Sequence, residues 1–446
     1  MDANDAGGRP FLAAPHRTLL TLALPVLGSL IAEPLTGLVD TAFVARLGAE
    51  PLAALGVGAT MLSAAFWAFS FLGVATQTEV GTLLGRGDEA HAAQVNALAL
   101  TLAALLGLAL TLSAWPGVPM AVGLLGAEGS VAELGVSYAR LRLLGAPAVL
   151  LTFAAFGALR GLQDMRTPLW IAAAVNILNV LLDYPLVFGL GPVPALGVAG
   201  AALASSLSQW IGAVWASLAA LRRLGRPDAL DWSRAPAIFT VGRDLFLRAA
   251  TLNLFLLVGT RTANNIGAEA GAVHQVIRSA WMFAALFLDS FALSGQSLTA
   301  YFVGSGRLDA ARRVAQVVCQ WSAGTGALLG LGMLVTERWM LEIFVPPEAA
   351  FLFAVPWRIS ALSQPINGLS FGTDGIHWGT GDFRYLRNAV IVATAVGITG
   401  LLLVDESAPG ALSLVWLAAV AWVSVRALLG VLRVWPGILD APLRRR

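Results

Sequence analysis

The chain of 446 residues has no lysine, one cysteine and little charge of either sign. The single Cys319 excludes an internal disulfide, and no CxxC or histidine-rich metal motif is present. Asp, Glu, Lys and Arg make up 12% of the residues, whereas soluble domains carry ~25%. Hydrophobic residues reach 57% before the 47 glycines are counted, too much apolar surface for so few charges to cover. The composition excludes an ordinary soluble enzyme and predicts an integral membrane protein.

The basic residues indicate topology. All 28 are arginines, the net charge is only +2, and most arginines lie at the ends of apolar runs instead of on one face. The sequence pI near 9.1 is therefore assigned to membrane orientation, and no nucleic-acid partner is expected. No GxxxxGK[ST] phosphate-binding loop and no metal set among the four histidines is found, so we expect neither an enzyme nor a bound cofactor.

Apolar stretches predict the fold class, an all-α polytopic membrane protein. A helix needs ~20 apolar residues to cross a bilayer. Twelve such stretches lie near residues 19–41, 52–74, 95–115, 131–153, 168–188, 195–218, 245–262, 272–293, 314–335, 350–371, 389–404 and 412–432. The polar start runs into the first stretch, which continues as a full span, so we expect no cleavable signal peptide.

Arginine also predicts the orientation. The N-terminus, every second loop and the C-terminus are rich in arginine, whereas the opposite loops hold only Arg46, Arg261 and Arg338. Because positive residues favour the cytoplasmic side, both termini are expected in the cytoplasm and the chain in the inner (cytoplasmic) membrane. An even number of spans is then required, and twelve satisfies it.

The two halves of the chain resemble each other. Residues 47–88 match residues 266–307 at a constant offset of 219, with a shared Gly-Ala-Glu, a shared glutamine and shared Gly-x-Gly pairs. Further on, residues 160–166 match residues 378–384 at an offset of 218. Two nearly equal offsets in separate stretches indicate a duplication.

The duplication predicts two six-helix repeats. We expect an N-terminal lobe at residues 1–221, a cytoplasmic linker at 222–244 and a C-terminal lobe at 245–446. An even number of spans in each half keeps the copies in the same orientation. Parallel repeats of this kind place a substrate site between the lobes and work by alternating access.

Carboxyl groups within the spans are the first functional candidates. Charge near the bilayer centre costs at least ~2.5–3.5 kcal/mol, so it is functional by default. Asp40 ends the first span, and Asn176, Asn179 and Asp183 share one face of the fifth because their spacings are three and four. Two buried carboxyls do not both ionise readily, so the pair can take up a proton, and the same oxygens suit a sodium ion. The alternative is that Asp40 pairs with an arginine as structural support.

The chain resembles the multidrug and toxic compound extrusion (MATE) family. The resemblance rests on the duplicated twelve spans, on Val39-Asp40-Thr41 at the end of the first span and on Arg160-Gly-x-x-Asp164 after the fourth. It covers nearly the whole chain and is greatest to the DinF-type branch. It implies export of amphipathic, often cationic compounds, driven by inward flow of protons or sodium ions.

The resemblance assigns roles to four residues. In DinF-like members a first-span Asp and an Asn/Asp pair on span five form the cation-coupling site, and a first-span proline bends with it. Asp40, Asn179, Asp183 and Pro25 match these positions. A hydroxyl from span six is also expected, and both Ser205 and Ser206 are possible donors.

The second lobe departs from the NorM-like branch of that family. NorM-like members use an acid in span seven with one in span ten, but span seven here has Arg248 and Asn253 and no acid. Asp374 therefore has no evident carboxyl partner, and an ion pair with Arg248 or Arg278 is at least as plausible as a coupling role. For Asp289 we favour a structural role.

We therefore expect a cation-coupled antiporter, with the proton favoured over sodium. The alternative is a lipid-linked precursor flippase of the same superfamily, and a channel is disfavoured by the duplicated architecture. The expected partners are a small amphipathic substrate and membrane lipid, and the expected state is a monomer.

Overall fold

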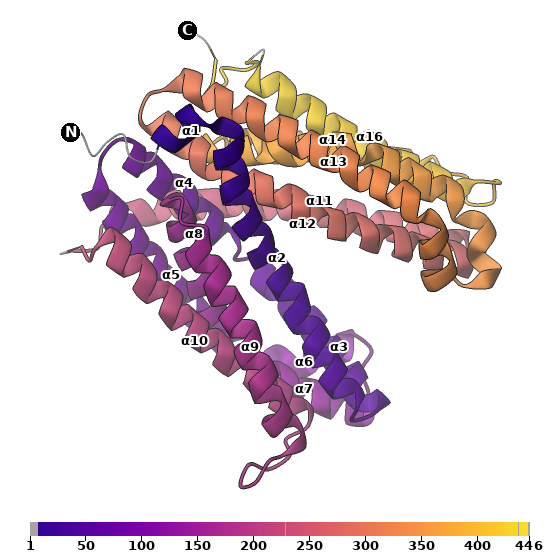
Figure 1. Cartoon of the computed structure of the whole chain (residues 1–446). Coiled ribbons are helices and arrows are strands. Elements are labelled where there is room, and N and C mark those ends of the chain that lie inside the picture. The colour runs from indigo at the N-terminus through magenta and orange to yellow at the C-terminus, as the bar shows by residue number, and fades with distance from the viewer. Residues whose placement is uncertain (1–7, 228, 436, 445–446) are drawn as a thin grey trace. The chain divides into compact units, whose positions relative to one another are not determined.

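The computed structural model describes residues 8–227, 229–435 and 437–444, and the regular elements of this part of the chain are all helices, with no β-strand (Figure 1). The first half holds α1 (Arg9–Ala13), α2 (Pro15–Ala45), α3 (Ala49–Trp67), α4 (Phe71–Gly85), α5 (Glu89–Ala114), η2 (Trp115–Gly117), α6 (Val118–Leu124), α7 (Gly129–Leu143), α8 (Ala146–Gly161), α9 (Arg166–Phe188) and α10 (Val198–Leu224). After η3 (Trp232–Arg234) come α11 (Ala235–Ile266), α12 (Ala268–Gly304), α13 (Leu308–Phe344), η4 (Pro347–Leu352), α14 (Ala354–Gly379), α15 (Phe383–Leu402) and α16 (Ala411–Val434).

These helices form twelve membrane segments in two sets of six, because α3–α4, α5–α6 and α7–α8 each make one broken segment. Eight segments within the described ranges are long and apolar enough to cross a membrane, and the α7–α8 pair, bent by 44°, makes a ninth. The other three segments, α10, α11 and α14, carry more polar side chains. In α14 these side chains face inward, since Gln364 and Asn367 are fully buried. The predicted all-α polytopic fold is confirmed.

The chain divides into two compact units. The N-lobe unit is Leu24–Gly242, and the C-lobe unit combines Met1–Ala23 with Arg243–Arg446. The second boundary lies inside the predicted linker. The first boundary differs from the predicted lobe of residues 1–221, because the start of the chain packs within the C-lobe unit. Phe11 packs on Phe302 with ring centroids 5.7 Å apart, and Trp321 Nε1 donates to His16 Nδ1 at 3.1 Å.

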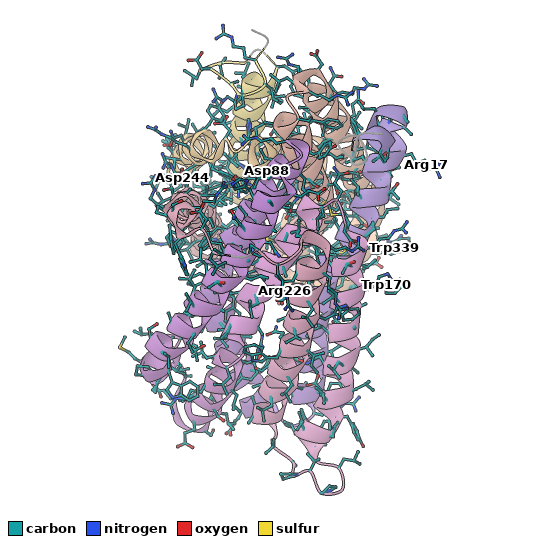
Figure 2. All side chains as sticks on the ribbon, turned by 90° about the vertical axis from the view of Figure 1, so that its left-hand side faces the viewer. Arg17, Asp88, Trp170, Arg226, Asp244 and Trp339 are labelled. Carbon is teal, nitrogen blue, oxygen red and sulfur yellow. The ribbon has the colours of Figure 1, made fainter. Side chains whose placement is uncertain are left out.

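Each unit has its own apolar core. In the N-lobe unit Leu62, Phe66 and Tyr138 are buried where α3 packs on α7. In the C-lobe unit aromatic rings dominate, and Phe255 stacks on Trp422 with centroids 4.4 Å apart. The outer faces are apolar as well, as membrane helices require. On α9, for example, Trp170 points away from the bundle with 64% of its surface exposed (Figure 2).

The duplication is preserved in close helix packing. In the N-lobe unit α8 crosses α4 so closely that a Cβ on Gly157 would lie 2.3 Å from the carbonyl oxygen of Gly73. In the C-lobe unit α14 crosses α12 in the same way, and a Cβ on Gly375 would lie 2.2 Å from the carbonyl oxygen of Ala292. These residues correspond at the offsets of 218 and 219, so both repeats contain the same helix crossing.

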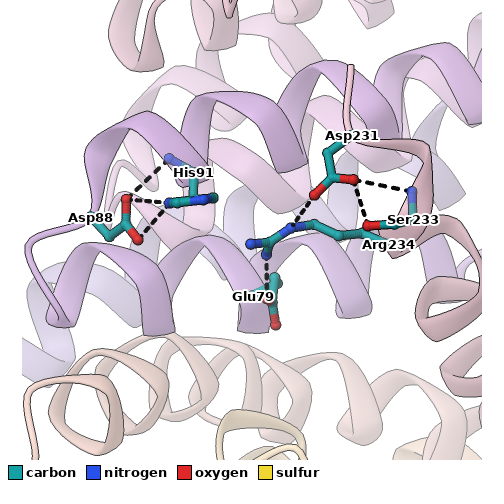
Figure 3. Close-up of polar contacts among 6 residues, drawn as sticks. All are labelled: Glu79, Asp88, His91, Asp231, Ser233 and Arg234. Atoms are coloured by element: carbon teal, nitrogen blue, oxygen red, sulfur yellow. Dashed lines mark hydrogen bonds and ion pairs between the residues drawn. The ribbon is translucent and has the colours of Figure 1, made fainter. Parts of the chain in front are cut away.

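The end of the linker folds back onto the N-lobe unit (Figure 3). Asp231 accepts hydrogen bonds from the backbone N–H and hydroxyl of Ser233 at 3.1 and 2.5 Å, and Arg234 Nε donates to it at 3.2 Å. Arg234 also pairs with Glu79 of α4 at 3.4 Å. The Ser233 hydroxyl bond holds the pKa of Asp231 below its ordinary value of 3.8. The carboxylate therefore stays ionised and keeps η3 anchored at neutral pH.

Candidate functional site

The site in the N-lobe unit is built around Asp40, near the end of α2. Ser205 Oγ on α10 donates to Asp40 Oδ2 at 2.8 Å, and Asn179 Nδ2 on α9 donates to Ser205 Oγ at 3.3 Å. All three residues are buried: the exposed fraction is 6% for Asp40, 2% for Ser205 and 0% for Asn179. Side chains from α2 and from the consecutive helices α9 and α10 thus meet at one carboxylate. Of the two predicted hydroxyl donors it is Ser205 that reaches Asp40, whereas Ser206 Oγ donates to the Leu141 carbonyl at 3.0 Å.

Asp183 adds a second carboxyl to this cluster. It lies on α9 one turn beyond Asn179, is fully buried, and interacts electrostatically with Asp40. Within the described residues, four buried oxygens of the cluster have no hydrogen-bond partner: Asp40 Oδ1, Asn179 Oδ1 and both carboxyl oxygens of Asp183. Unpaired buried acceptors are costly. A proton or a hard cation with oxygen ligands would satisfy them.

Asn176 has hydrogen-bond partners other than Asp40, Asn179 and Asp183. It accepts a hydrogen bond from Thr36 Oγ1 at 2.5 Å, and its own Nδ2 donates to the Ala172 carbonyl at 3.0 Å. Thr36 is one turn before Asp40 on α2, so the bond of Asn176 links α9 to α2 one turn away from Asp40. Pro25 lies inside α2, one residue after the boundary between the two units.

Arg142 is a cation that acts on the cluster, and the sequence analysis assigned no role to it there. It interacts electrostatically with Asp40 and with buried Tyr138, while its Nη1 donates to Gln209 Oε1 at 2.8 Å. Among the described residues no arginine lies within 4 Å of the Asp40 carboxylate, so Asp40 is not held in a direct ion pair. The signal that could have found this pair is the spacing of four between Tyr138 and Arg142, which places both on one face of α7.

The carboxylates of the C-lobe unit are in a different situation. Asp374 on α14 lies between Arg426 of α16, whose Nη2 donates to it at 2.8 Å, and Arg248 of α11, which also bonds it. Of the two predicted alternatives, Arg248 and Arg278, it is Arg248 that pairs with Asp374, and Arg426 is a further partner that was not predicted. Asp289 on α12 interacts electrostatically with Arg426. Asp374 is therefore neutralised by two arginines, which favours a structural role.

Comparison with known proteins agrees with this architecture. The MatE family model matches residues 25–185 and 245–402. Protein DETOXIFICATION 44, chloroplastic, from Arabidopsis thaliana is 29% identical over 95% of this chain and 84% of its own length. DNA damage-inducible protein F of Escherichia coli (strain K12) is 27% identical over 94% of this chain and 92% of its own length.

Solved structures share the fold. One described as the outward-facing conformation of a multidrug resistance MATE family transporter of the MOP superfamily superposes with a TM-score of 0.88. It is 20% identical, and the alignment covers 99% of both chains. The family match extends over both repeats, and it includes Asp40, Asn179 and Asp183 of the N-lobe cluster. The chain belongs to the MatE family of multidrug and toxic compound extrusion transporters.

Proposed function

We propose that this transporter is an antiporter that exports amphipathic organic compounds, often cationic ones, in exchange for protons entering the cell. It works as a monomer in the inner membrane with both termini in the cytoplasm. No cofactor is involved, and the coupling ion binds the N-lobe cluster. The relatives named above do not favour the alternative of a lipid-linked precursor flippase.

The observation that carries this proposal is the set of four buried, unpartnered acceptor oxygens on Asp40, Asn179 and Asp183. Two neighbouring carboxyls in a buried site do not both ionise readily, so one of them takes up a proton. A sodium ion would use the same oxygens. Like other hard cations, however, it needs several oxygen ligands at about 2.3–2.6 Å. A proton needs only one acceptor, and we favour it for that reason.

Proton binding supplies the driving force. One proton moving down ~100 mV releases ~2.3 kcal/mol. Neutralising Asp40 removes the cost of a buried charge and rearranges its bond with Ser205. We infer that α2 then bends near Pro25 and releases the substrate outward, and that inward opening returns the proton to the cytoplasm.

The test is proton-driven efflux by Asp40→Asn in proteoliposomes. Asparagine mimics the protonated acid permanently, so the variant should fold and bind substrate but lose pH-driven efflux. Asp309→Asn is the matched control, because Asp309 is an exposed acid at the start of α13 and its loss should leave efflux unchanged. Wild-type efflux by Asp40→Asn would exclude Asp40 as the obligatory carrier. Efflux that requires a sodium gradient and ignores pH would assign the cluster to sodium.

A further inference from the structure

The break between α7 and α8 is held by side chains of α10. The two helices bend by 44° at this break. Trp210 Nε1 of α10 donates to the Leu144 carbonyl inside the break at 2.9 Å. One residue earlier on α10, Gln209 Oε1 accepts a hydrogen bond from Arg142 Nη1 at 2.8 Å. The guanidinium of Arg142 is thus fixed by α10 at the end of α7.

The same stretch of α10 also bonds Asp40. Ser205 lies one turn before Gln209, and its hydroxyl donates to Asp40 Oδ2 at 2.8 Å. One helical turn therefore holds both the carboxylate of α2 and the guanidinium of α7. The two charges interact electrostatically, yet no direct ion pair joins them among the described residues. Arg142 is therefore a counter-charge of Asp40 that acts without touching it.

The other groups around Arg142 come from α3, α7 and α9. The ring centroid of Phe66 on α3 lies 5.9 Å from Arg142 Cζ. Tyr138 lies one turn before Arg142 on α7, is 3% exposed, and interacts electrostatically with the guanidinium and with both carboxyls of the cluster. The titratable groups that face this charge are therefore Asp40, Asp183 and Tyr138. The helices packed on α7 here, α3 and α10, contribute the Phe66 ring and an amide, which do not titrate.

These groups determine the charge balance of the cluster. A tyrosine hydroxyl is neutral near pH 7, so two ionised carboxyls and one guanidinium give a net charge of −1. Net charge around buried carboxyls is costly, so uptake of one proton, which brings the sum to zero, is favoured. Without the guanidinium, the same neutrality requires two protons. Arg142 therefore decides whether the pair of Asp40 and Asp183 rests with one proton or with two.

The C-lobe repeat has no equivalent of Arg142. At the offset of 218, Arg142 corresponds to Ser360 and Tyr138 to Pro356. Identical residues on both sides keep this register: Arg140 with Arg358, and Pro147 with Pro365. The cation is thus present in the repeat that has the carboxyl pair and absent from the repeat in which two arginines already neutralise Asp374. This distribution links Arg142 to the cluster and not to the scaffold that the two repeats share.

We propose that Arg142 is a positioning residue for ion coupling, a fixed counter-charge that lets the carboxyl pair rest with one proton and makes the second proton the transported one. This rests on the proposed function, to which it adds the residue that sets the pH at which the pair loads and unloads. In the resting state Asp183 holds one proton and Asp40 is ionised. The second proton binds the Asp40 carboxylate from outside. It leaves on the cytoplasmic side because the doubly protonated pair and Arg142 together carry an uncompensated positive charge.

The test is the pH profile of efflux in proteoliposomes, with a constant pH difference across the membrane and a varied absolute pH. Arg142→Gln removes the charge, so the second proton is held more tightly and released only at higher pH. We expect its efflux to be reduced at neutral pH and restored at alkaline pH. The pH of half-maximal efflux on the acidic side should rise by about one unit or more, the effect of an opposite charge near a carboxyl. Arg142→Lys keeps the charge and should move this value less.

Arg140→Gln is the matched control. It removes an arginine two residues away on α7, whose Cζ lies over the Trp115 ring, 5.7 Å from its centroid. Its half-maximal pH should equal that of the wild type. An equal rise in this control would show that any charge on α7 has the effect, and it would overturn the assignment to Arg142.

Two further results would overturn the proposal: an unchanged half-maximal pH in Arg142→Gln, or a loss of efflux that no pH restores, as expected of a purely structural residue. Should Arg142→Gln fail to fold, Gln209→Met removes the acceptor that fixes the guanidinium and keeps the size of the side chain. Its half-maximal pH should also rise, and an unchanged value would contradict the proposal. Asp40→Asn tests the coupling function separately. If it loses pH-driven efflux while Arg142→Gln behaves as the wild type, the role of Arg142 fails and the proposed function stands.

Discussion

Removal of the Asp374 charge tests how the C-lobe unit tolerates its buried arginines. In Asp374→Asn the side chain keeps its size, but Arg248 and Arg426 lose the carboxylate that both of them bond. The two guanidiniums then face each other as like charges without the carboxylate that lay between them. Their ring contacts remain, with Arg426 4.9 Å from the Trp422 centroid and Arg248 5.3 Å from that of Trp378.

The expected loss of stability is large. Removing one partner of a buried pair costs about 3–5 kcal/mol, because the other charge stays buried. Cation–π contacts worth ~1–2 kcal/mol each do not change in the variant and cannot compensate for the loss. Thermal unfolding in detergent, followed by the monodisperse fraction on size exclusion, should show a clearly lower midpoint for Asp374→Asn. The exposed Asp309→Asn, which loses a surface pair with Arg312, should change the free energy of unfolding by less than ~1 kcal/mol.

The same variant separates structural from coupling roles. Transport per folded molecule should be retained better by Asp374→Asn than by Asp183→Asn, since only Asp183 belongs to the cluster at Asp40. Equal stability of Asp374→Asn and the wild type would refute the argument about the buried charges. The reverse ranking in transport would move the coupling site to the C-lobe unit.

Three more predictions concern packing, topology and the linker. Gly157→Ala should lower the yield of folded protein by overpacking worth ~1–3 kcal/mol or more, whereas Gly37→Ala, which meets no atom within 4 Å, should not. In a Cys319→Ala background, Ala229→Cys should react with an impermeant maleimide in inside-out vesicles and not in intact cells. A cysteine in the α6–α7 turn is the control that should react in intact cells. Labelling of Ala229→Cys in intact cells would show that the predicted orientation is wrong. Asp231→Asn should speed amide hydrogen exchange in η3. Because the pKa of Asp231 is lowered, its wild-type contacts hold above pH 3.8 and are lost only as the pH falls through that lowered pKa. The wild-type exchange rate, corrected for its intrinsic pH dependence, should therefore stay constant from pH 8 to 5.

The sequence predicts those features of this fold that depend on local pattern. Apolar length gives the spans, and the repeat offsets give the two halves. Helical periodicity places Asn179 and Asp183 on one face, and the structure brings that face to Asp40. Periodicity also groups Asn176 with them, and the structure shows that Asn176 bonds Thr36, one turn before Asp40 on α2. Spacing within α9 does not select that partner on another helix.

Long-range pairing accounts for what the sequence could not supply. The choice of Ser205 over Ser206 depends on the rotation of α10, which no local pattern fixes. Arg426 reaches Asp374 across 52 residues of chain, and its charge alone does not select its partner. The grouping of residues 8–23 with the C-lobe unit depends on the contact of Phe11 with Phe302, which are two ordinary apolar positions.

The matching crossings of Gly157 over Gly73 and Gly375 over Ala292 have a consequence for how such a protein can evolve. In both copies the backbone path depends on the space left by a missing side chain, whereas the ligand chemistry depends on a few polar residues elsewhere. The positions that preserve the architecture are therefore different from the positions that carry the polar chemistry. After gene duplication one copy can change its polar residues without redesigning its scaffold, so the two halves can diverge in chemistry while they keep the same helix crossing.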